Sequence, residues 1–450
     1  MRHDTLFMRT ATLVATLTAV DFAIAETLHV PADHTTIQSC IDAAVSGQDE
    51  CVVAPGTYNE TIDFLGKAIT LRSSDGPEAT IIDATGLNDS VITFKSGEGL
   101  DSVVEGFTIT GGTGGHHPNT HHGGGIYISH ASPTIIDNII TKNHLGEDTE
   151  GYNGGGIYLN HSNALITNNT IEKNVALGGG GIWMSFSAPT IEDNLILHNI
   201  ADDSGGGIGI SYSTGLISRN LIAGNRAGML DGGAIGMGVS SPRLISNAII
   251  GNTSGIFGGA LLIAAASAPT IEGCTIVGNM SDYNFISIFQ DSSANFANSI
   301  IVFNSSRKEI VSIDRPEFAH CDGHGNNVGQ CFVCSAFPAG SGGNISNDPL
   351  FVRNPSDGGD GWGDDPATTD VDEGANDDFG DLRLQLGSPC IDAGDPDFEP
   401  LPGETDLGGR ARVSCGRVDM GAYERVQNCR PRTDAVNRTP QSRHLESTSD

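Results

Sequence analysis

The sequence has little positive charge and no long apolar stretches. Only 17% of its 450 residues are charged, and 23 lysines and arginines stand against 55 aspartates and glutamates, for a formal net charge of −32. This negative field repels polyanions, so we expect no nucleic-acid partner. No apolar run is long enough to cross a bilayer, so no transmembrane segment is expected. The 60 glycines indicate a large β protein with many bends.

The N-terminus has the pattern of a signal peptide. Arg2 and Arg9 precede an apolar run over residues 11–20, and Ala23-Ile24-Ala25 offers a cleavage site between small residues. We therefore expect residues 1–25 to direct export, and the protein to be secreted or to lie on the extracellular surface.

Residues 123–304 repeat one pattern with a period of mostly 25 to 27 residues. Each copy reads apolar-x-x-Asn-x-Ile-x-x-Asn, as at Ile135, Asn138, Ile140 and Asn143. Later copies place the first asparagine at Asn169, Asn194, Asn220 and Asn247, and then a cysteine at Cys274. Such a period is typical of solenoids, in which each unit buries its apolar face only by stacking on its neighbours.

The repeat also predicts the form of the coil. Ile126 and Ile128 alternate with more variable residues, as Ile157 and Leu159 do in the next copy, which is the period of a strand with one face inside. We expect parallel strands about 4.8 Å apart in a right-handed coil. The recurring asparagines are then structural, because a stacked amide bonds to the backbone of the adjacent turns.

These repeats resemble those of right-handed parallel β-helix proteins of the pectate-lyase-like superfamily, over roughly residues 100–304. The resemblance implies an all-β solenoid. It leaves function open, because the fold carries lyases, hydrolases, epimerases, phage tail proteins and non-catalytic surface proteins. The Asp-Asp pair of polygalacturonases has a counterpart in Asp202-Asp203, but their Gly-His-Gly and Arg-Ile-Lys motifs are missing.

Residues 26–99 resemble the entry segment of exported bacterial β-helix proteins and are expected to form a cap and the first turns. Thr35 and Thr36 are capping candidates for a short helix. One face of that helix would carry Ile37, Cys40, Ile41 and Ala44. Because disulfides form in exported proteins, we expect one between Cys40 and Cys51.

The regular pattern ends after the repeats. We expect residues 305–347 to be a Cys/Gly-rich insertion, residues 348–425 an irregular acidic segment that closes the solenoid, and residues 426–450 a disordered polar tail. Residues 387–394 and 419–424 resemble the closing segment of exported bacterial β-helix proteins. There it typically precedes a surface anchor, in the so-called choice-of-anchor arrangement.

The insertion contains a cysteine and histidine cluster. Cys321, His324, Cys331 and Cys334 have a spacing that suits a zinc site, and a pair of disulfides is the alternative that export favours. The total of nine cysteines is odd, so at least one thiol is free or pairs between chains. Cys274 in the interior ladder is the best candidate for a buried thiol.

An outward column of aromatic residues is the first candidate site. Tyr127, Tyr158 and Trp183 follow the inward isoleucines on three successive turns. Flat aromatic faces in a row suit sugar rings. Cross-turn stacking that only stabilises the sheet is the alternative.

Two polar groups are further candidates. The loops carry His116, His117, His121 and His122, which would suit a divalent metal if the loops stack, although variable polar loops look the same.

The superfamily resemblance implies another site, in which acidic residues hold calcium and a basic residue takes a proton. Here Asp137, Glu192 and Asp193 would hold the ion and Arg219 would be the base, and a simple salt bridge is the alternative.

The sequence therefore predicts an exported, all-β, right-handed parallel β-helix with an N-terminal capping helix and an irregular C-terminal region. We expect it to interact with a polysaccharide or cell-surface glycan through the aromatic column. A calcium-dependent polysaccharide lyase of the pectate-lyase type is one alternative, and a purely structural or adhesive solenoid is the other. Calcium is the expected cofactor if the ligand is acidic, because it would bridge two negative surfaces.

Overall fold

The structure is a computed structural model that describes residues 25–117, 120–146, 152–228, 232–306, 316–326, 340–363, 373–414 and 416–426. At residues 116, 117 and 120 it describes the backbone alone. The expected signal peptide, apart from Ala25, and the expected tail beyond Val426 lie outside the described residues. So do Cys331 and Cys334 of the predicted cysteine cluster.

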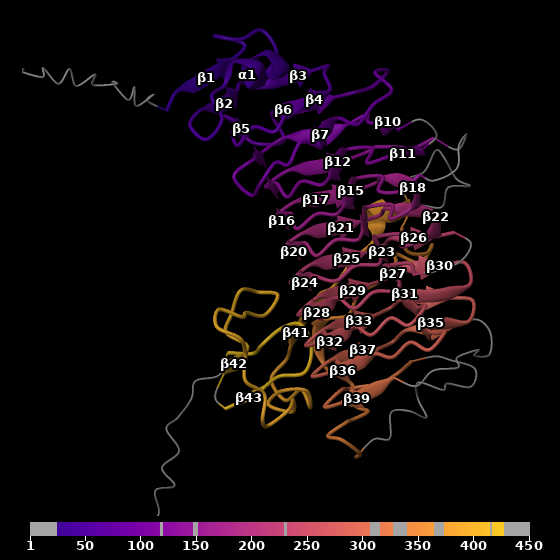
Figure 1. Cartoon of the computed structure of the whole chain (residues 1–450). Coiled ribbons are helices and arrows are strands. Elements are labelled where there is room, and N and C mark those ends of the chain that lie inside the picture. Colours follow the sequence, from indigo (N-terminus) through magenta and orange to yellow (C-terminus); the bar gives the residue numbers. More distant parts are fainter. Residues whose placement is uncertain are drawn as a thin grey trace, which may run out of the picture.

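The chain coils into a β-solenoid whose longest sheet, here sheet A, has twelve parallel strands (Figure 1). In spatial order these are β1 (Thr27–Val30), β2 (Glu50–Val53), β5 (Thr70–Ser73), β8 (Val103–Glu105), β13 (Thr134–Ile136), β16 (Leu165–Thr167), β20 (Thr190–Glu192), β24 (Leu216–Ser218), β28 (Arg243–Ile245), β32 (Thr270–Glu272), β36 (Asn295–Ala297) and β39 (Glu317–Ala319). Equivalent residues of successive turns pair directly, as Ile135 does with Ile166.

Two further parallel sheets complete most turns. Sheet B contains β3 (Gly56–Tyr58), β6 (Thr80–Asp83), β9 (Thr108–Thr110), β14 (Ile139–Thr141), β17 (Thr170–Glu172), β21 (Leu195–Leu197), β25 (Leu221–Ala223), β29 (Ala248–Ile250), β33 (Thr275–Val277) and β37 (Ile300–Val302). Sheet C contains β4 (Ile62–Asp63), β7 (Ile92–Phe94), β12 (Ile126–Ser129), β15 (Ile157–Asn160), β19 (Ile182–Ser185), β23 (Ile208–Ser211), β27 (Ile235–Gly238), β31 (Phe257–Ala264) and β35 (Asn284–Ile288).

A fourth, six-stranded sheet lies between sheets B and C along the chain. It contains β18 (Val175–Gly178), β22 (Ile200–Ser204), β26 (Arg226–Ala227), β30 (Thr253–Ser254), β34 (Met280–Ser281) and β38 (Ser305–Ser306). The loop before β12 forms a separate hairpin of β10 (Gly115–His117) and β11 (Thr120–His122). No helix in the described part of the chain is long and apolar enough to span a membrane.

The interior of the coil is one continuous apolar core. Ile126, Ile157 and Ile182 stack in register in sheet C and are fully buried. This confirms the predicted alternation of inward and outward residues. Burying such side chains stabilises the fold by about 1.5–3 kcal/mol each, so the repeated isoleucines supply much of the driving force.

The asparagine ladder has the predicted structural role. Asn169 Oδ1 accepts hydrogen bonds from Asn138 N at 3.0 Å and from Asn138 Nδ2 at 3.1 Å, and Asn194 Oδ1 accepts the same pair from Asn169. Each side chain also donates to backbone of the preceding turn, as Asn169 Nδ2 does to Ile135 O at 2.8 Å. The second asparagine of the repeat forms an equivalent ladder that begins at Asn143.

The N-terminal end is capped as predicted. Helix α1 (Ile37–Ala43) begins after Thr36, whose side chain accepts from Ser39 N at 3.1 Å in a capping box. Its predicted inner face is buried. Cys40 and Cys51 form the predicted disulfide, which ties α1 to β2. The cap therefore covers the first strand edge of the solenoid.

The solenoid continues beyond the point where the sequence pattern placed its end. Strand β39 pairs in parallel with β36, as Phe296 does with Phe318. Asn326 extends one asparagine ladder through Asn304, and Asn344 accepts from Cys321 N at 2.9 Å in the other. The described part of residues 305–347 thus contains a further turn, because irregular spacing hid the repeat.

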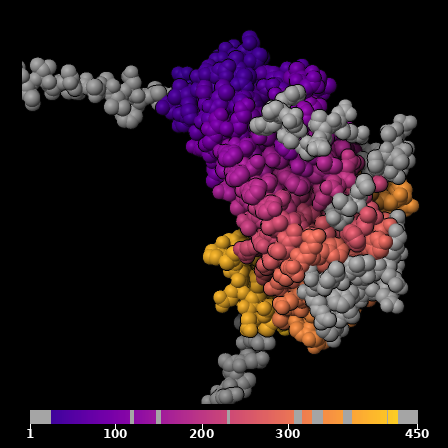
Figure 2. All heavy atoms as spheres, turned by 45° about the vertical axis from the view of Figure 1, so that its right-hand side comes forward, coloured from indigo at the N-terminus to yellow at the C-terminus, as the bar shows by residue number. Residues whose placement is uncertain are grey.

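The C-terminal segment packs on the side of the solenoid and not only on its end (Figures 1 and 2). It contains β40 (Phe351–Arg353), the 3-10 helix η1 (Glu373–Asn376), β41 (Asp381–Leu384), β42 (Val413–Ser414) and β43 (Arg417–Val418). A second apolar core joins Phe351, Leu382 and Met420 to the outer face of sheet B. Two backbone contacts fix it, from Ala422 N to Thr275 Oγ1 at 2.9 Å and from Gly421 N to Asn298 O at 2.7 Å.

Buried carboxylates hold the last part of this segment together. The Glu424 carboxylate accepts from Ser414 N and from Asp419 N, both at 2.9 Å, and Asp419 accepts from Asp392 N at 2.7 Å. Burial, followed by repulsion from Asp419, raises the pKa of Glu424 to about 8. Burial likewise raises the pKa of Asp419 to about 6.

Candidate functional site

The predicted aromatic column faces outward from sheet C but is largely covered. Only 8% of Tyr127 and 6% of Tyr158 is exposed, and Trp183 is half-buried. The Tyr127 and Tyr158 rings stack with centroids 5.6 Å apart, and His122 stacks on Tyr158 at 4.3 Å. A role in sugar binding stays a prediction for these residues, with Trp183 the most open of them.

A second aromatic column lies at the next corner of the coil. His130, His161, Phe186 and Tyr212, here called the corner column, follow strands β12, β15, β19 and β23 directly. Successive ring centroids are 4.7, 5.2 and 4.9 Å apart, and the rings lie within 16° of parallel. Phe186 is 53% exposed and Tyr212 is 54% exposed. Spacing of this kind corresponds to offset stacking, in which each ring covers only part of its neighbour's face.

The backbone explains why the corner column projects into solvent. All four residues have a positive φ, between 47° and 54°, because the chain turns there from sheet C toward sheet A. The preceding outward residue of each strand is polar or small, as at Ser129, Asn160 and Ser185. Ser129 Oγ lies 3.0 Å from His130 Nδ1, and the Asn160 amide contacts the His161 ring. The column therefore combines ring faces with adjacent hydrogen-bonding groups.

The sequence contains a signal for this column, although the column was not predicted. An aromatic or histidine residue recurs directly after the sheet C strand in four successive copies, at the same period as the asparagines. The period of the repeat therefore gave the register of these residues. Their exposure also depends on the turn geometry, which the pattern does not display.

The predicted lyase group forms a salt bridge. Arg219 donates from Nε and Nη2 to the Asp193 carboxylate at 2.9 and 2.7 Å, and from Nη2 to Glu192 Oε2 at 2.7 Å. These contacts, with Asp193 first, raise the pKa of Arg219. Asp137 lies two turns away, with Asn168 between it and Asp193. Among the described residues no three or more His, Cys, Asp or Glu side chains gather as a metal site.

The predicted histidine group is only partly described. The side chains of His116 and His117 lie outside the described residues. His121 stacks on Tyr152 with centroids 6.1 Å apart, and His122 Nδ1 accepts from Asn153 N at 3.3 Å. The two described histidines thus help the loops cover sheet C.

The described cysteines outside the disulfide are buried and free. Cys274 is fully buried, as predicted, and burial raises its pKa to about 11. Burial raises the pKa of Cys321 to about 12, which opposes the thiolate that a zinc ligand requires. Cys390 Sγ contacts Asp322 Oδ2 at 3.3 Å and links the C-terminal segment to the last turns.

Comparison with known proteins agrees with this architecture. The family model of the right-handed β-helix region matches residues 68–202 and 155–332, which together make up more than half of the chain. The chain belongs to the right-handed β-helix family. No curated protein matches its sequence.

Several solved structures are similar to this β-helix protein at low sequence identity. A pectate lyase is 14% identical, with a TM-score of 0.49, and the match covers 90% of this chain and 96% of the lyase. A family 6 alginate lyase is also 14% identical, with a TM-score of 0.32, over 85% of this chain and 60% of that one. A mannuronic acid specific family 6 lyase from the human gut microbiota is 11% identical, with a TM-score of 0.26, over 70% of this chain and 85% of that one.

Proposed function

We propose that this protein is an exported polysaccharide-binding β-helix, and that the corner column is its binding surface. The exposed, offset-stacked rings of the corner column carry the proposal. Sugar rings bind to proteins by laying their C–H faces on aromatic rings while hydroxyl groups bond to adjacent polar side chains. The corner column offers both kinds of contact on four successive turns, with Ser129, Asn160, Ser185 and Ser211 as the adjacent residues.

Charge narrows the class of polysaccharide. The net charge of −32 disfavours a polyanion at any surface of this protein unless cations bridge the two. A neutral polysaccharide is therefore the preferred ligand, and it requires no calcium. Export is supported by the pattern of residues 1–25 and by the disulfide, which is typical of proteins in oxidising compartments.

The lyase alternative has weaker support. A base must bind a proton from the substrate, but the two carboxylates beside Arg219 hold its guanidinium in the charged form. With its donors already directed at Glu192 and Asp193, this group has the geometry of a cross-turn ion pair.

The test is retention on soluble neutral polysaccharides in affinity electrophoresis, for example xyloglucan, glucomannan and hydroxyethyl cellulose. We expect at least one to retain the protein, and Phe186→Ala with Tyr212→Ala to weaken binding about tenfold or more, which corresponds to about 1.4 kcal/mol. Leu350→Ala is the control, because Leu350 is also exposed, by 38%, with a φ of 52°.

Three results would contradict the proposal. The first is equal retention of the double variant and the native protein. The second is retention only on polygalacturonate with calcium present. The third is release of an unsaturated product with loss of activity in Arg219→Ala, which would establish the lyase instead.

A further inference from the structure

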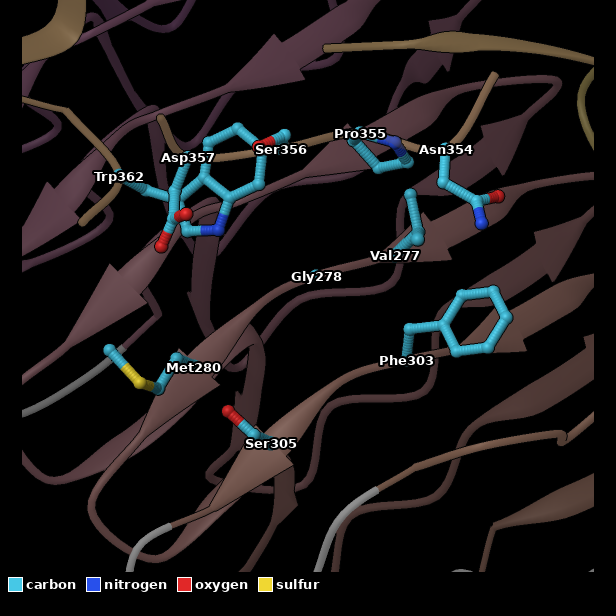
Figure 3. Close-up of a pocket in the computed structure, with 10 residues that line it drawn as sticks. All are labelled: Val277, Gly278, Met280, Phe303, Ser305, Asn354, Pro355, Ser356, Asp357 and Trp362. Atoms are coloured by element: carbon cyan, nitrogen blue, oxygen red, sulfur yellow. The ribbon is translucent and has the colours of Figure 1, made fainter. Parts of the chain in front are cut away.

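Two adjoining pockets lie where the C-terminal segment meets the solenoid, here called the seam. The first, of about 430 Å³, lies between Met280, Phe303 and Ser305 on the solenoid and residues 354–357 with Trp362 on the C-terminal segment (Figure 3). The second, of about 260 Å³, shares Met280 and Trp362 with the first. It extends to Arg226, Asp282 and Asp360. The seam lies across the solenoid from the corner column, beside sheet B and the six-stranded sheet.

Glycines on the solenoid form the seat of Trp362. A Cβ atom at Gly251 would overlap the indole, and one at Gly278 would lie 3.5 Å from its Cζ2 atom. Both glycines have a positive φ, of 61° and 69°. Three successive turns carry glycine at this position, from Gly224 to Gly278, whereas earlier turns carry larger side chains such as Lys173. The indole is therefore fixed against the backbone of two turns and is stacked with the Phe379 ring, with centroids 6.1 Å apart. The rest of the indole stays half-buried beside the pockets.

The C-terminal segment, which forms the other side of the seam, is held in place by its own hydrogen bonds. Ser356 and Asp378 exchange two backbone hydrogen bonds, both at 2.8 Å. Gly363 N donates to Asp377 Oδ2 at 2.9 Å, directly after Trp362. A segment fixed in this way costs little ordering entropy on binding, as is usual for small-molecule sites.

The lining of the first pocket combines aromatic and polar side chains. Phe303 and Trp362 provide ring surface, and Asn354, Ser356 and Ser305 provide amide and hydroxyl groups around the first pocket. We propose that the seam binds a neutral saccharide of one or two sugar units, with Trp362 as the stacking platform. A volume of about 430 Å³ lies in the range of ligand sites and holds a ligand of this size.

Charge and existing contacts argue against other ligand classes. Asp357 in the first pocket, with Asp282 and Asp360 in the second, outnumber Arg226, which disfavours an anionic sugar. The acidic groups also have donors of their own. Asp357 Oδ1 accepts a hydrogen bond from Gly359 N at 3.1 Å, and Asp360 Oδ2 accepts one from Asn376 Nδ2 at 2.8 Å. Because two of the three carboxylates already accept hydrogen bonds within the protein, they attract a polyamine or other cation less strongly.

Tryptophan fluorescence tests this proposal, because the chain has two tryptophans. In Trp183→Phe, Trp362 is the sole indole. We expect cellobiose, mannobiose or xylobiose to change its emission saturably, and Phe303→Ala in this background to weaken the response about tenfold or more. Leu350→Ala is the control and should change nothing.

Two further ligands in the same assay, one anionic and one cationic, identify the ligand class. A response to digalacturonate or to spermidine, with none to the neutral disaccharides, would overturn the proposal. So would the absence of any response in a folded Trp183→Phe protein. Folding is checked by thermal unfolding, and Phe303→Leu, which keeps a large apolar side chain, replaces Phe303→Ala if that variant does not fold.

The proposals for the seam and for the corner column can be rejected independently of each other. The Trp362 response should survive Phe186→Ala with Tyr212→Ala, and retention on polysaccharide should survive Trp362→Phe. A native protein that shows the Trp362 response but is retained on none of the polysaccharides rejects the corner column alone, and a native protein that is retained but shows no Trp362 response rejects the seam alone.

Discussion

Two aromatic columns run down the same side of this solenoid, three residues apart in each turn, and only one is open. Tyr127 and Tyr158 stand in the middle of sheet C, where His122 stacks on Tyr158 and covers it. His130 and Phe186 stand at the corner, where a positive φ directs them outward. An outward register therefore does not make a residue accessible, because loops from other turns decide what is covered.

Sheet B shows the same contrast along its length. On early turns the outward residue that ends each strand is polar and half-buried, as at Thr141 and Glu172. On late turns they are apolar and buried, as at Ile250, Val277 and Val302, because the C-terminal segment packs on them. The change from polar to apolar marks where that segment docks.

Removing a covered ring should have the largest effect on stability. Tyr158→Ala leaves a cavity between Tyr127 and His122, and we expect it to lower the free energy of unfolding by about 3 kcal/mol. Guanidinium unfolding measures this. A loss below about 1 kcal/mol would mean that the covered column is no better packed than the open one.

Raising the pH should destabilise the C-terminal segment that packs on sheet B. The folded-state pKa values of Glu424, about 8, and Asp419, about 6, lie above the usual values of 4.5 and 3.8. The folded segment therefore binds protons more tightly, so its stability is complete below about pH 4 and falls as the pH rises toward 8. We expect a loss on the order of a few kcal/mol.

Hydrogen exchange of residues 413–425 at about pH 5 and pH 9 measures this effect. Glu424→Gln should remove most of the pH dependence, because the amide is neutral throughout. Exchange in strand β13, which the segment does not touch, is the internal control. A segment that becomes more protected at high pH would contradict the prediction.

The Trp183 site should tolerate no added side chain on the next turn. A Cβ atom at Gly209 would overlap the Trp183 ring, so Gly209→Ala should cost about 1–3 kcal/mol and shift Trp183 emission. Gly238→Ala is the matched control, because a Cβ atom there meets nothing within 4 Å and the residue lies in the same sheet. Equal stability of the two variants would show that the indole is free to move.

Replacing aromatic residues of the corner column with alanine should have the smallest effect on stability. Phe186 stacks on His161 and Tyr212, so Phe186→Ala should cost about 1 kcal/mol, and Tyr212→Ala about half as much because it stacks on one ring only. Urea unfolding of the single and double variants measures both. A loss as large as that of Tyr158→Ala would mean that the corner column is a structural element rather than an exposed one.

Much of the architecture was predictable because the repeat carries it. The alternation around Ile126, the amide of Asn138 and the capping Thr36 each act on their own turn or the next one, so their roles follow from local pattern. The extra turn at β39 was missed, because its ladder residue Asn326 comes only 22 residues after Asn304. A ladder of serines was missed as well, in which Ser187 N donates to Ser213 Oγ at 3.0 Å.

The candidate sites were less predictable, because they depend on distant segments. Gly224, Gly251 and Gly278 interrupt a column of larger residues, but nothing in the sequence indicates that Trp362 lies against the last two. Arg219 and Asp193 were found together by their register, whereas the strength of the pairing depended on their side-chain geometry.

The sequence by itself determined the coil, its register, its cap and the order of residues on each face, because stacking at a fixed period makes every turn a copy of the one before. Only the tertiary structure decided which outward faces remain open. The covers are not part of the repeat: a loop hairpin lies over Tyr158, and the C-terminal segment, which follows the last turn, lies over Val277 and Gly251.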